Sequence, residues 1–249
     1  MKLNNYKIFI AILFLCLQTQ LFSQGWEALA DINNPTPFPA MAAAGGKLYL
    51  VGGTQGGAAS TFEYTPGTNT WDIKSSVPQG TIYQTALTVN GKIYLMGGGQ
   101  SNVKKDLNYI YDPTLDTWTT GASLLTPRMY HSAAVVNNKI YLIGGQNGDG
   151  TTEWYFDEYD PATDTWTRKT QTPHAEAWYC AAVGLDNDFY RIAGGRWNAP
   201  TRYFDKYDTE TDTWTQLPLF PDSLHAPAAV TIEKKILVMG GICNKEEID

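Results

Sequence analysis

The sequence predicts an all-β protein, a β-propeller of about five blade units whose last blade is incomplete. Two phrases repeat along the chain and predict this fold. One is an aromatic phrase that ends at Trp71, Trp118, Trp166 and Trp214, with spacings of 47, 48 and 48 residues. The other is an apolar segment that ends in two glycines and occurs five times, in step with the first. Small four-stranded sheets cannot bury both faces alone, so we expect them to stack radially around an axis.

Residues 1–23 are interpreted as a secretory signal peptide, and residues 24–249 as the propeller domain. Lys2 and Lys7 precede the ten-residue apolar run IFIAILFLCL, and Ser23 is the small residue expected before the cleavage site. The run is shorter than the ~20 residues that a membrane-spanning helix needs. The sequence therefore predicts a secreted protein, periplasmic or extracellular, with no membrane insertion after cleavage.

The third repeat illustrates the four strands expected in each unit. Residues 131–136 (HSAAVV) form the first strand, and their small side chains suit the crowded axis of a propeller. The second strand, 139–145, ends at a pair of glycines, which punctuate strand ends. Residues 154–160 (WYFDEYD) alternate aromatic with charged side chains, as a half-buried third strand does. The fourth strand is expected at 165–171.

The turn between the third and fourth strands belongs to the repeated aromatic phrase. In the third repeat it reads DPATD, in which Pro161 sets φ and the aspartate side chains accept hydrogen bonds from nearby backbone amides. Tyr159 and Trp166 flank this turn, and a large aromatic ring buries about 150–250 Å² when it packs. We expect these rings to fill the gap between neighbouring blades, so that the phrase repeats for structural reasons.

The C-terminal end breaks the pattern. After Gly240 and Gly241 only ICNKEEID follows, which is too short to complete a third and a fourth strand. The segment around Trp26 resembles a lone fourth strand that could complete the last blade. Two interpretations are open at this point: a five-blade ring with a defective closing blade, or a fragment of a six- or seven-blade ring.

Charge and cysteine content exclude some classes of function. The formal net charge is −7, and it becomes −9 when residues 1–23, with Lys2 and Lys7, are removed. An acidic chain without a cluster of Lys and Arg is not expected to bind nucleic acid or an anionic membrane. Cys180 and Cys243 are the only cysteines after residue 23, so no disulfide framework is expected, although a single bond between the two is open.

The repeat resembles that of the kelch family, in which a glycine pair follows an apolar strand and spaced Tyr and Trp residues come next. The resemblance covers about residues 25–241, and the period is close to the ~50 residues of kelch repeats. The WD repeat fits poorly, because only Trp71 is followed by Asp. The resemblance implies a kelch-type propeller that binds a partner on one face. Several kelch proteins recognise acidic peptide motifs through Arg and Ser, and Arg128 and Arg196 would be the equivalents.

One face of the expected propeller carries the candidate ligand-binding residues. Because successive strands run in opposite directions, the loops after the second strands and those before the first strands meet on one face, here called the loop face. The candidates on these loops are Arg128, Tyr130, His131, Arg196, Trp197, Trp178, Tyr83, Gln146, Asn147 and Glu176. Arg offers a planar fork to carboxylates, and aromatic rings are common in ligand sites. The sequence thus predicts a site for a protein segment or a glycan. In the alternative interpretation the aromatic rings pack between blades and Arg128 holds a loop by donating to carbonyls.

No residue is assigned to catalysis, and no cofactor or metal is expected. His131, His174 and His225 lack the spacing of metal ligands, and no nucleophile elbow or phosphate loop is present. One alternative is a sugar isomerase similar to the sialic-acid mutarotases or epimerases, which would bind an anionic sugar through the two arginines of the loop face. A further alternative is a copper oxidase, because MYHSA resembles the stretch of galactose oxidase in which adjacent Tyr and His bind copper. Tyr130 and His131 would correspond, but that enzyme also needs a second histidine and a Cys–Tyr crosslink.

Overall fold

The computed structural model describes residues 28–32, 37–53, 59–147, 154–174, 177–196 and 198–242. The chain divides into two compact units, residues 1–32 and 33–249, and every strand belongs to the second unit. Within the described ranges there is no helix with the length and hydrophobicity that a membrane span requires. The interpreted signal peptide, residues 1–23, lies outside the described residues.

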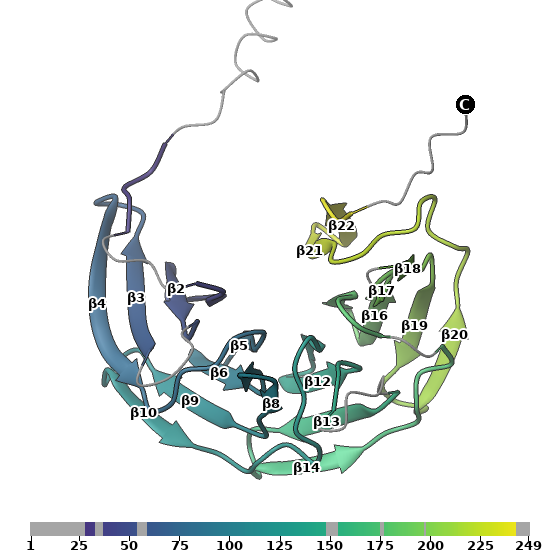
Figure 1. Ribbon diagram of the computed structural model, residues 1–249, viewed down its shortest axis with the longest axis horizontal. Coiled ribbons are helices and arrows are strands. Elements are labelled where there is room, and N and C mark those ends of the chain that lie inside the picture. The colour runs from purple at the N-terminus through teal and green to yellow at the C-terminus, as the bar shows by residue number, and fades with distance from the viewer. Residues whose placement is uncertain are drawn as a thin grey trace, which may run out of the picture. The chain divides into compact units, whose positions relative to one another are not determined.

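The second unit consists of antiparallel sheets that follow one another along the chain, four of them with four strands each (Figure 1). Blade 1 contains β1 (Ala40–Ala44), β2 (Lys47–Val51), β3 (Ala59–Thr65) and β4 (Thr70–Val77). Blade 2 contains β5 (Thr85–Val89), β6 (Lys92–Met96), β9 (Asn108–Asp112) and β10 (Thr117–Thr120). Blade 3 contains β11 (Ser132–Val136), β12 (Lys139–Ile143), β13 (Phe156–Asp160) and β14 (Thr165–Arg168). Blade 4 contains β15 (Ala181–Leu185), β16 (Asp188–Ile192), β19 (Phe204–Asp208) and β20 (Thr213–Gln216), and blade 5 has β21 (Ala228–Ile232) and β22 (Lys235–Met239). The prediction of about five units with an incomplete last blade is confirmed.

The blades of this unit form an arc, with the first strand of each blade on the inside and the fourth on the outside (Figure 1). The first strands β1, β5, β11, β15 and β21 are neighbours in that order. The described sheets do not close into a ring, because blade 1 and the β21–β22 pair stand at the two ends of the arc (Figure 1). Small residues permit the close approach of the first strands. A Cβ on Gly184 of β15 would lie 2.1 Å from the carbonyl oxygen of Val135 in β11.

The repeated aromatic phrase clamps each blade to the segment that leaves the preceding one. In blade 3 the Tyr159 hydroxyl donates to Oδ1 of Asp164 at 2.7 Å, and the Tyr159 and Trp166 rings lie 4.9 Å apart. The backbone N–H of Ala122, which follows blade 2, also donates to Asp164 Oδ1 at 2.7 Å. Trp166 Nε1 donates to the carbonyl of Ala122 at 2.9 Å. Both backbone groups of Ala122 are thereby satisfied, which confirms that Tyr159 and Trp166 fill an interblade gap.

The same clamp recurs between blades 1 and 2 and between blades 3 and 4. Asp116 and Trp118 bond to the backbone of Ser75, and Asp212 and Trp214 bond to that of Thr170. The clamp aspartates have φ values of 52°, 53° and 54° in blades 2, 3 and 4. Asp and Asn tolerate this left-handed region better than most residues. The repeated Asp before Thr-Trp is therefore required both by its backbone conformation and by its contact to the neighbouring blade.

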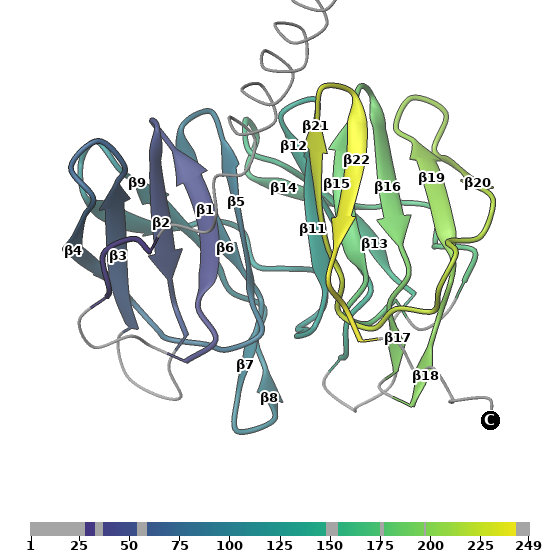
Figure 2. The same cartoon turned by 90° about the horizontal axis from the view of Figure 1, so that it is seen from above.

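Two short hairpins are not predicted by the sequence. β7 (Gly99–Gln100) pairs with β8 (Val103–Lys104) in blade 2, and β17 (Gly195–Arg196) pairs with β18 (Ala199–Pro200) in blade 4. Both hairpins project from the same side of the unit, the loop face (Figure 2). Strands of two residues are too short to show the alternation from which a strand is recognised.

Candidate functional site

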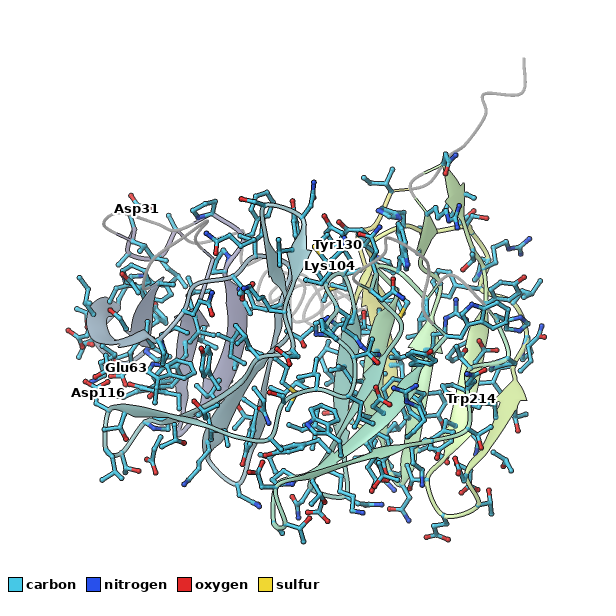
Figure 3. All side chains as sticks on the ribbon, turned by 60° about the horizontal axis from the view of Figure 1, so that its bottom comes forward. Asp31, Glu63, Lys104, Asp116, Tyr130 and Trp214 are labelled. Carbon is cyan, nitrogen blue, oxygen red and sulfur yellow. The ribbon has the colours of Figure 1, made fainter. Side chains whose placement is uncertain are left out.

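Four aromatic residues, Phe38, Tyr83, Tyr130 and Tyr179, form a continuous row on the loop face, here called the aromatic row. Each lies two residues before the first strand of its blade. The ring centroids of successive members are 5.0, 4.4 and 4.7 Å apart. His225 extends the row, because its ring lies 4.7 Å from that of Tyr179. Tyr130 lies near the middle of the unit in the view of Figure 3. One surface thus receives a ring from each of four blades.

The backbone of the aromatic row has an uncommon conformation. Phe38, Tyr83, Tyr130 and Tyr179 have φ values of 55°, 61°, 62° and 47°, and Ala226, at the same position of blade 5, has 54°. Left-handed backbone costs about 1–2 kcal/mol for a residue with a side chain. Interblade hydrogen bonds hold it: the N–H of Tyr130 donates to the carbonyl of Tyr83 at 3.3 Å, that of Tyr179 to Tyr130 at 3.1 Å, and that of Ala226 to Tyr179 at 3.1 Å. The row is therefore fixed by a hydrogen-bonded chain that crosses four blades.

The tyrosine hydroxyls of the row interact with one another. Burial, the neighbouring Tyr83 and a side-chain hydrogen bond with Tyr83 raise the pKa of Tyr130, although its hydrogen bond with Tyr179 acts in the opposite direction. Burial is also the largest cause that raises the pKa of Tyr179, followed by the charge of and hydrogen bond with Tyr130. Both phenols therefore stay protonated at neutral pH and are able to donate hydrogen bonds.

A cavity of about 230 Å³ lies beside the row. Its walls are Tyr83, Gln84, Tyr130, His131, Ser132, Tyr179, Cys180, Ala226 and Pro227. None of these side chains carries a charge at neutral pH. Burial and the nearby Arg128 lower the pKa of His131 to about 3, and burial raises the pKa of the Cys180 thiol. Cys180 is a free cysteine, and Cys243 lies outside the described residues.

Arg128 does not lie on the surface, contrary to its role as a candidate ligand-binding residue. Its side chain is fully buried, and Nη2 donates to Oδ2 of Asp157 at 2.6 Å. Nη1 donates to the carbonyl of Gly144 at 3.3 Å, and Nε to that of Thr126 at 3.3 Å. A buried arginine with these partners holds the loop before blade 3, as the alternative interpretation of the sequence has it, and adds an ion pair to β13.

His131 is also a packing residue and not an exposed one. Its ring is 5% exposed, and Nε2 forms a 2.9 Å hydrogen bond with Oγ1 of Thr85 in blade 2. A Cβ on Gly97 would lie 2.6 Å from its Cε1 atom, so the glycine pair of blade 2 leaves the space that this ring fills. Tyr130 belongs to the aromatic row, while His131 is inserted between blades 2 and 3. The described residues contain no group of three His, Cys, Asp or Glu side chains that could hold a metal ion.

The remaining candidates are distributed over the loop face. Arg196 of β17 is exposed, and its guanidinium lies 5.7 Å from the centre of the Trp178 ring. Trp178 is half-buried, and its ring lies 6.5 Å from that of Tyr130. Gln146 and Asn147 are half-buried after β12, where the backbone of Gln146 pairs with that of Met129. Trp197 and Glu176 lie outside the described residues.

Sequence reasoning did not select Phe38 or Tyr179, it left two roles open for Arg128, and it did not place His131 between blades. A positional signal was present: the residue two places before each first strand is aromatic in blades 1 to 4. Gln84 was also missed as a packing residue. It occupies in blade 2 the position of His131, and its Nε2 donates to the carbonyl of Phe38 at 3.3 Å.

A larger cavity, of about 440 Å³, lies at the opposite end of blades 1 and 2. Each lysine of its walls contacts a carboxylate of the same walls: Lys47 and Lys74 contact Glu63 at 2.6 and 3.7 Å, and Lys92 contacts Asp112 at 3.5 Å. The Tyr49 hydroxyl also donates to Glu63, at 2.7 Å. Blade 3 repeats this arrangement with Lys139, Glu158 and Tyr141, which indicates a structural role.

Comparisons with known proteins agree with this architecture. The family model of the KLHDC2/KLHL20/DRC7 kelch-repeats domain matches residues 38–241. A solved structure, that of YjhT, is similar with a TM-score of 0.73 and 18% sequence identity, over 86% of this chain and 75% of that one. At this identity the similarity concerns the fold alone. No curated protein sequence matches the chain significantly.

Proposed function

Because the chain belongs to the kelch-repeat family, we propose that it is a binding module that holds a segment of a partner protein at the aromatic row. The kelch propeller fold in general supports a protein-binding role. The observation that carries the proposal is that four blades place a large ring at the same left-handed backbone position. Glycine would occupy this position without strain. Rings retained at a conformational cost, beside a cavity, favour a binding site over simple packing.

The proposed module acts outside the cytoplasm, after removal of residues 1–23. The apolar run between Lys7 and Gln18 supports export, as does the small residue Ser23 before the expected cleavage point. Sequencing the N-terminus of the protein recovered from the extracellular or periplasmic fraction would test export. A first residue at or near Gln24 is expected, and a full-length cytoplasmic protein would contradict it.

A neutral glycan is the second candidate ligand, because the tyrosine rings and their protonated hydroxyls form one continuous surface. The sugar-isomerase alternative has less support than the sequence suggested. It required two exposed arginines for an anionic sugar, and Arg128 is buried and paired with Asp157.

Selection of binding peptides from a random displayed library would test the proposed function. Peptides enriched on the protein should bind at least about tenfold more weakly to a Tyr130→Gly/Tyr179→Gly variant, which loses two central rings. Glycine at these positions adopts positive φ readily, so the backbone of the variant is not strained. The matched control is Ile73→Ala, since Ile73 is 72% exposed on β4, at the outer edge of blade 1.

The expected result is weaker binding to the double variant and unchanged binding to the control. Enriched peptides that bind all three proteins equally would place the site elsewhere and contradict the proposal. A cooperative unfolding transition in the double variant would establish that lost binding is not lost folding.

A further inference from the structure

The chemistry of the partner segment is indicated by the walls of the cavity. We propose that the aromatic row takes an uncharged, proline-rich segment of the partner, bound as a polyproline II helix. This inference rests on the proposed function and specifies the segment that the row accepts. Three observations support it: the absence of charge at the cavity walls, the half-exposed rings, and the spacing of the rings.

The walls of the cavity match an uncharged ligand. Tyr130 and Tyr179 are protonated at neutral pH, His131 is neutral and the thiol of Cys180 is not ionised. The guanidinium of Arg128 is 0% exposed and is neutralised by Asp157 at 2.6 Å. Burying a carboxylate against such walls would cost several kcal/mol, because nothing there pairs with it. An acidic motif therefore does not fit the cavity.

The aromatic row also offers the kind of surface on which a polyproline II helix docks. Such a helix has no internal hydrogen bonds, so its carbonyls accept bonds from a partner. Proline-rich segments dock on aromatic surfaces for this reason, and their preformed conformation lowers the entropic cost of binding. Tyr83, Tyr130 and Tyr179 are each half-buried, and so expose part of the ring to a ligand. The rings are the contacts that would meet the prolines, because the hydroxyls of Tyr130 and Tyr179 are already engaged in hydrogen bonds within the row.

The spacing of the rings is compatible with this helix. One turn of polyproline II has three residues and advances about 9 Å. The Tyr83 ring is 4.4 Å from that of Tyr130, which is 4.7 Å from that of Tyr179. The Tyr83 and Tyr179 rings are therefore at most about 9 Å apart, so one turn of the helix is long enough to cover all three rings.

A charged group lies at the edge of the row and not within it. Arg196 lies over the Trp178 ring, which is 6.5 Å from the ring of Tyr130. This cation is the group through which an acidic segment would bind instead. Salt dependence therefore distinguishes the two kinds of partner, because exposed ion pairs weaken as salt screens them while apolar contacts do not.

Titration of the whole secreted chain with an end-capped oligoproline peptide tests the inference. The comparison ligands are a capped Gly-Ser peptide, a capped Glu-rich peptide of equal length and a neutral oligosaccharide. Intrinsic fluorescence is a suitable readout, since Tyr130 and Trp178 lie at the site. We expect saturable binding of oligoproline that does not change between low and high salt, and at least about tenfold weaker binding of the other three ligands.

Three variants test the site. Tyr130→Gly should weaken oligoproline binding about tenfold, because it removes a ring and leaves the left-handed backbone unstrained. Tyr179→Phe keeps the ring and removes only a hydroxyl that is bonded to Tyr130 within the row, so binding close to that of the parent is expected. A loss as large as that of Tyr130→Gly would overturn the ring contact. Ile73→Ala, far from the row on the exposed β4, should bind as the parent does.

Each alternative outcome overturns the inference in a distinguishable way. If the Glu-rich peptide binds in a salt-dependent manner, and Tyr130→Gly weakens it, the row binds a protein segment of the opposite chemistry. If the oligosaccharide alone binds at the row, both the proline-rich segment and the protein-binding function are wrong. If oligoproline does not bind while library-selected peptides do, the proposed function stands and the polyproline II inference fails.

Discussion

Blades 3 and 4 hold the same buried acid in two different ways. Asp157 of β13 and Asp205 of β19 follow Phe156 and Phe204, the first residues of the two third strands. Both carboxylates are almost fully buried. In each blade a tyrosine precedes the third strand and a cationic or imidazole group lies over it. Because the scaffold is common to the two blades, their difference isolates the effect of the partner residues.

The partners of Asp157 satisfy both of its oxygens. Arg128 Nη2 contacts Oδ2 at 2.6 Å, and Arg168 Nε donates to Oδ1. The Arg168 guanidinium also lies 3.7 Å from the centre of the Tyr155 ring. Close geometry of this kind offsets the desolvation of a buried ion pair, which looser pairs do not achieve.

Asp205 has a looser environment. Arg191 Nη1 lies 3.4 Å from Oδ2 and His174 Nε2 lies 3.5 Å from Oδ1, while the His174 ring stacks on Tyr203 at 3.7 Å. Oδ1 of Asp205 and Nε and Nη2 of Arg191 have no hydrogen-bond partner within the described part of the chain. Burial raises the pKa of Asp205, although Arg191 and His174 act in the opposite direction. The carboxylate at this repeated position is thus held by close contacts in blade 3 and by looser contacts in blade 4.

Removing the arginines should give the largest difference between the blades. Arg128→Met should lower the free energy of unfolding by about 3 kcal/mol, because it leaves a buried carboxylate with one partner fewer. Arg191→Met should cost less, about 1–2 kcal/mol, because Asp205 takes up a proton more readily than a tightly paired acid does. Chemical denaturation of both variants at neutral pH measures the difference. Equal losses would contradict the distinction between a tight and a loose pair.

The pH dependence of Asp205 gives a smaller effect with a defined sign. Its pKa is raised above 3.8, the ordinary value, so its stabilising contribution is complete below pH 3.8 and is lost as the pH rises through the folded-state pKa. The Asp205→Asn variant has no titratable group at this position and therefore serves as the reference. The free energy of unfolding of the parent should therefore fall relative to that of Asp205→Asn as the pH rises above 3.8. The measurement is a denaturation series for both proteins, and a parent that gains relative stability over this range would reverse the assignment.

The smallest effect is expected where the two blades are alike. Trp166 donates to Ala122 and Trp214 to Thr170, each at 2.9 Å. Trp166→Phe and Trp214→Phe should each lower the free energy of unfolding by up to about 1 kcal/mol, because each removes a donor to a backbone carbonyl. The Ala122 carbonyl keeps a second donor, Asn108 Nδ2 at 3.1 Å. Thermal and chemical unfolding of the two variants should agree within about 0.5 kcal/mol, and Ile73→Ala, on the exposed β4, should fall within that margin of the parent. If the two variants lost very different free energies of unfolding, the two clamps would be stabilised by contacts other than the hydrogen bonds that they share.

The candidate site was predictable only in part. The loop face followed from strand direction, and three residues selected from it, Tyr83, Tyr130 and Trp178, are members or neighbours of the aromatic row. A ligand-binding and a loop-holding role stayed open for Arg128, because the sequence does not reveal its buried partner Asp157, which is 29 residues away. His131 was misplaced because the space it fills is created by Gly97 of another blade.

The sequence by itself determined the repeat, the blade count and the residues of the interblade clamp. These features depend on contacts that recur at a fixed period. Tyr159, Asp164 and Trp166 can therefore be recognised in the sequence, because equivalent residues occur at the same spacing in the other repeats. Only the tertiary structure decided which loop residues are exposed and that Phe38, Tyr83, Tyr130 and Tyr179 touch across blades. The physical reason is that burial and ring stacking depend on residues far apart in the sequence, whose approach is set by the arrangement of whole blades.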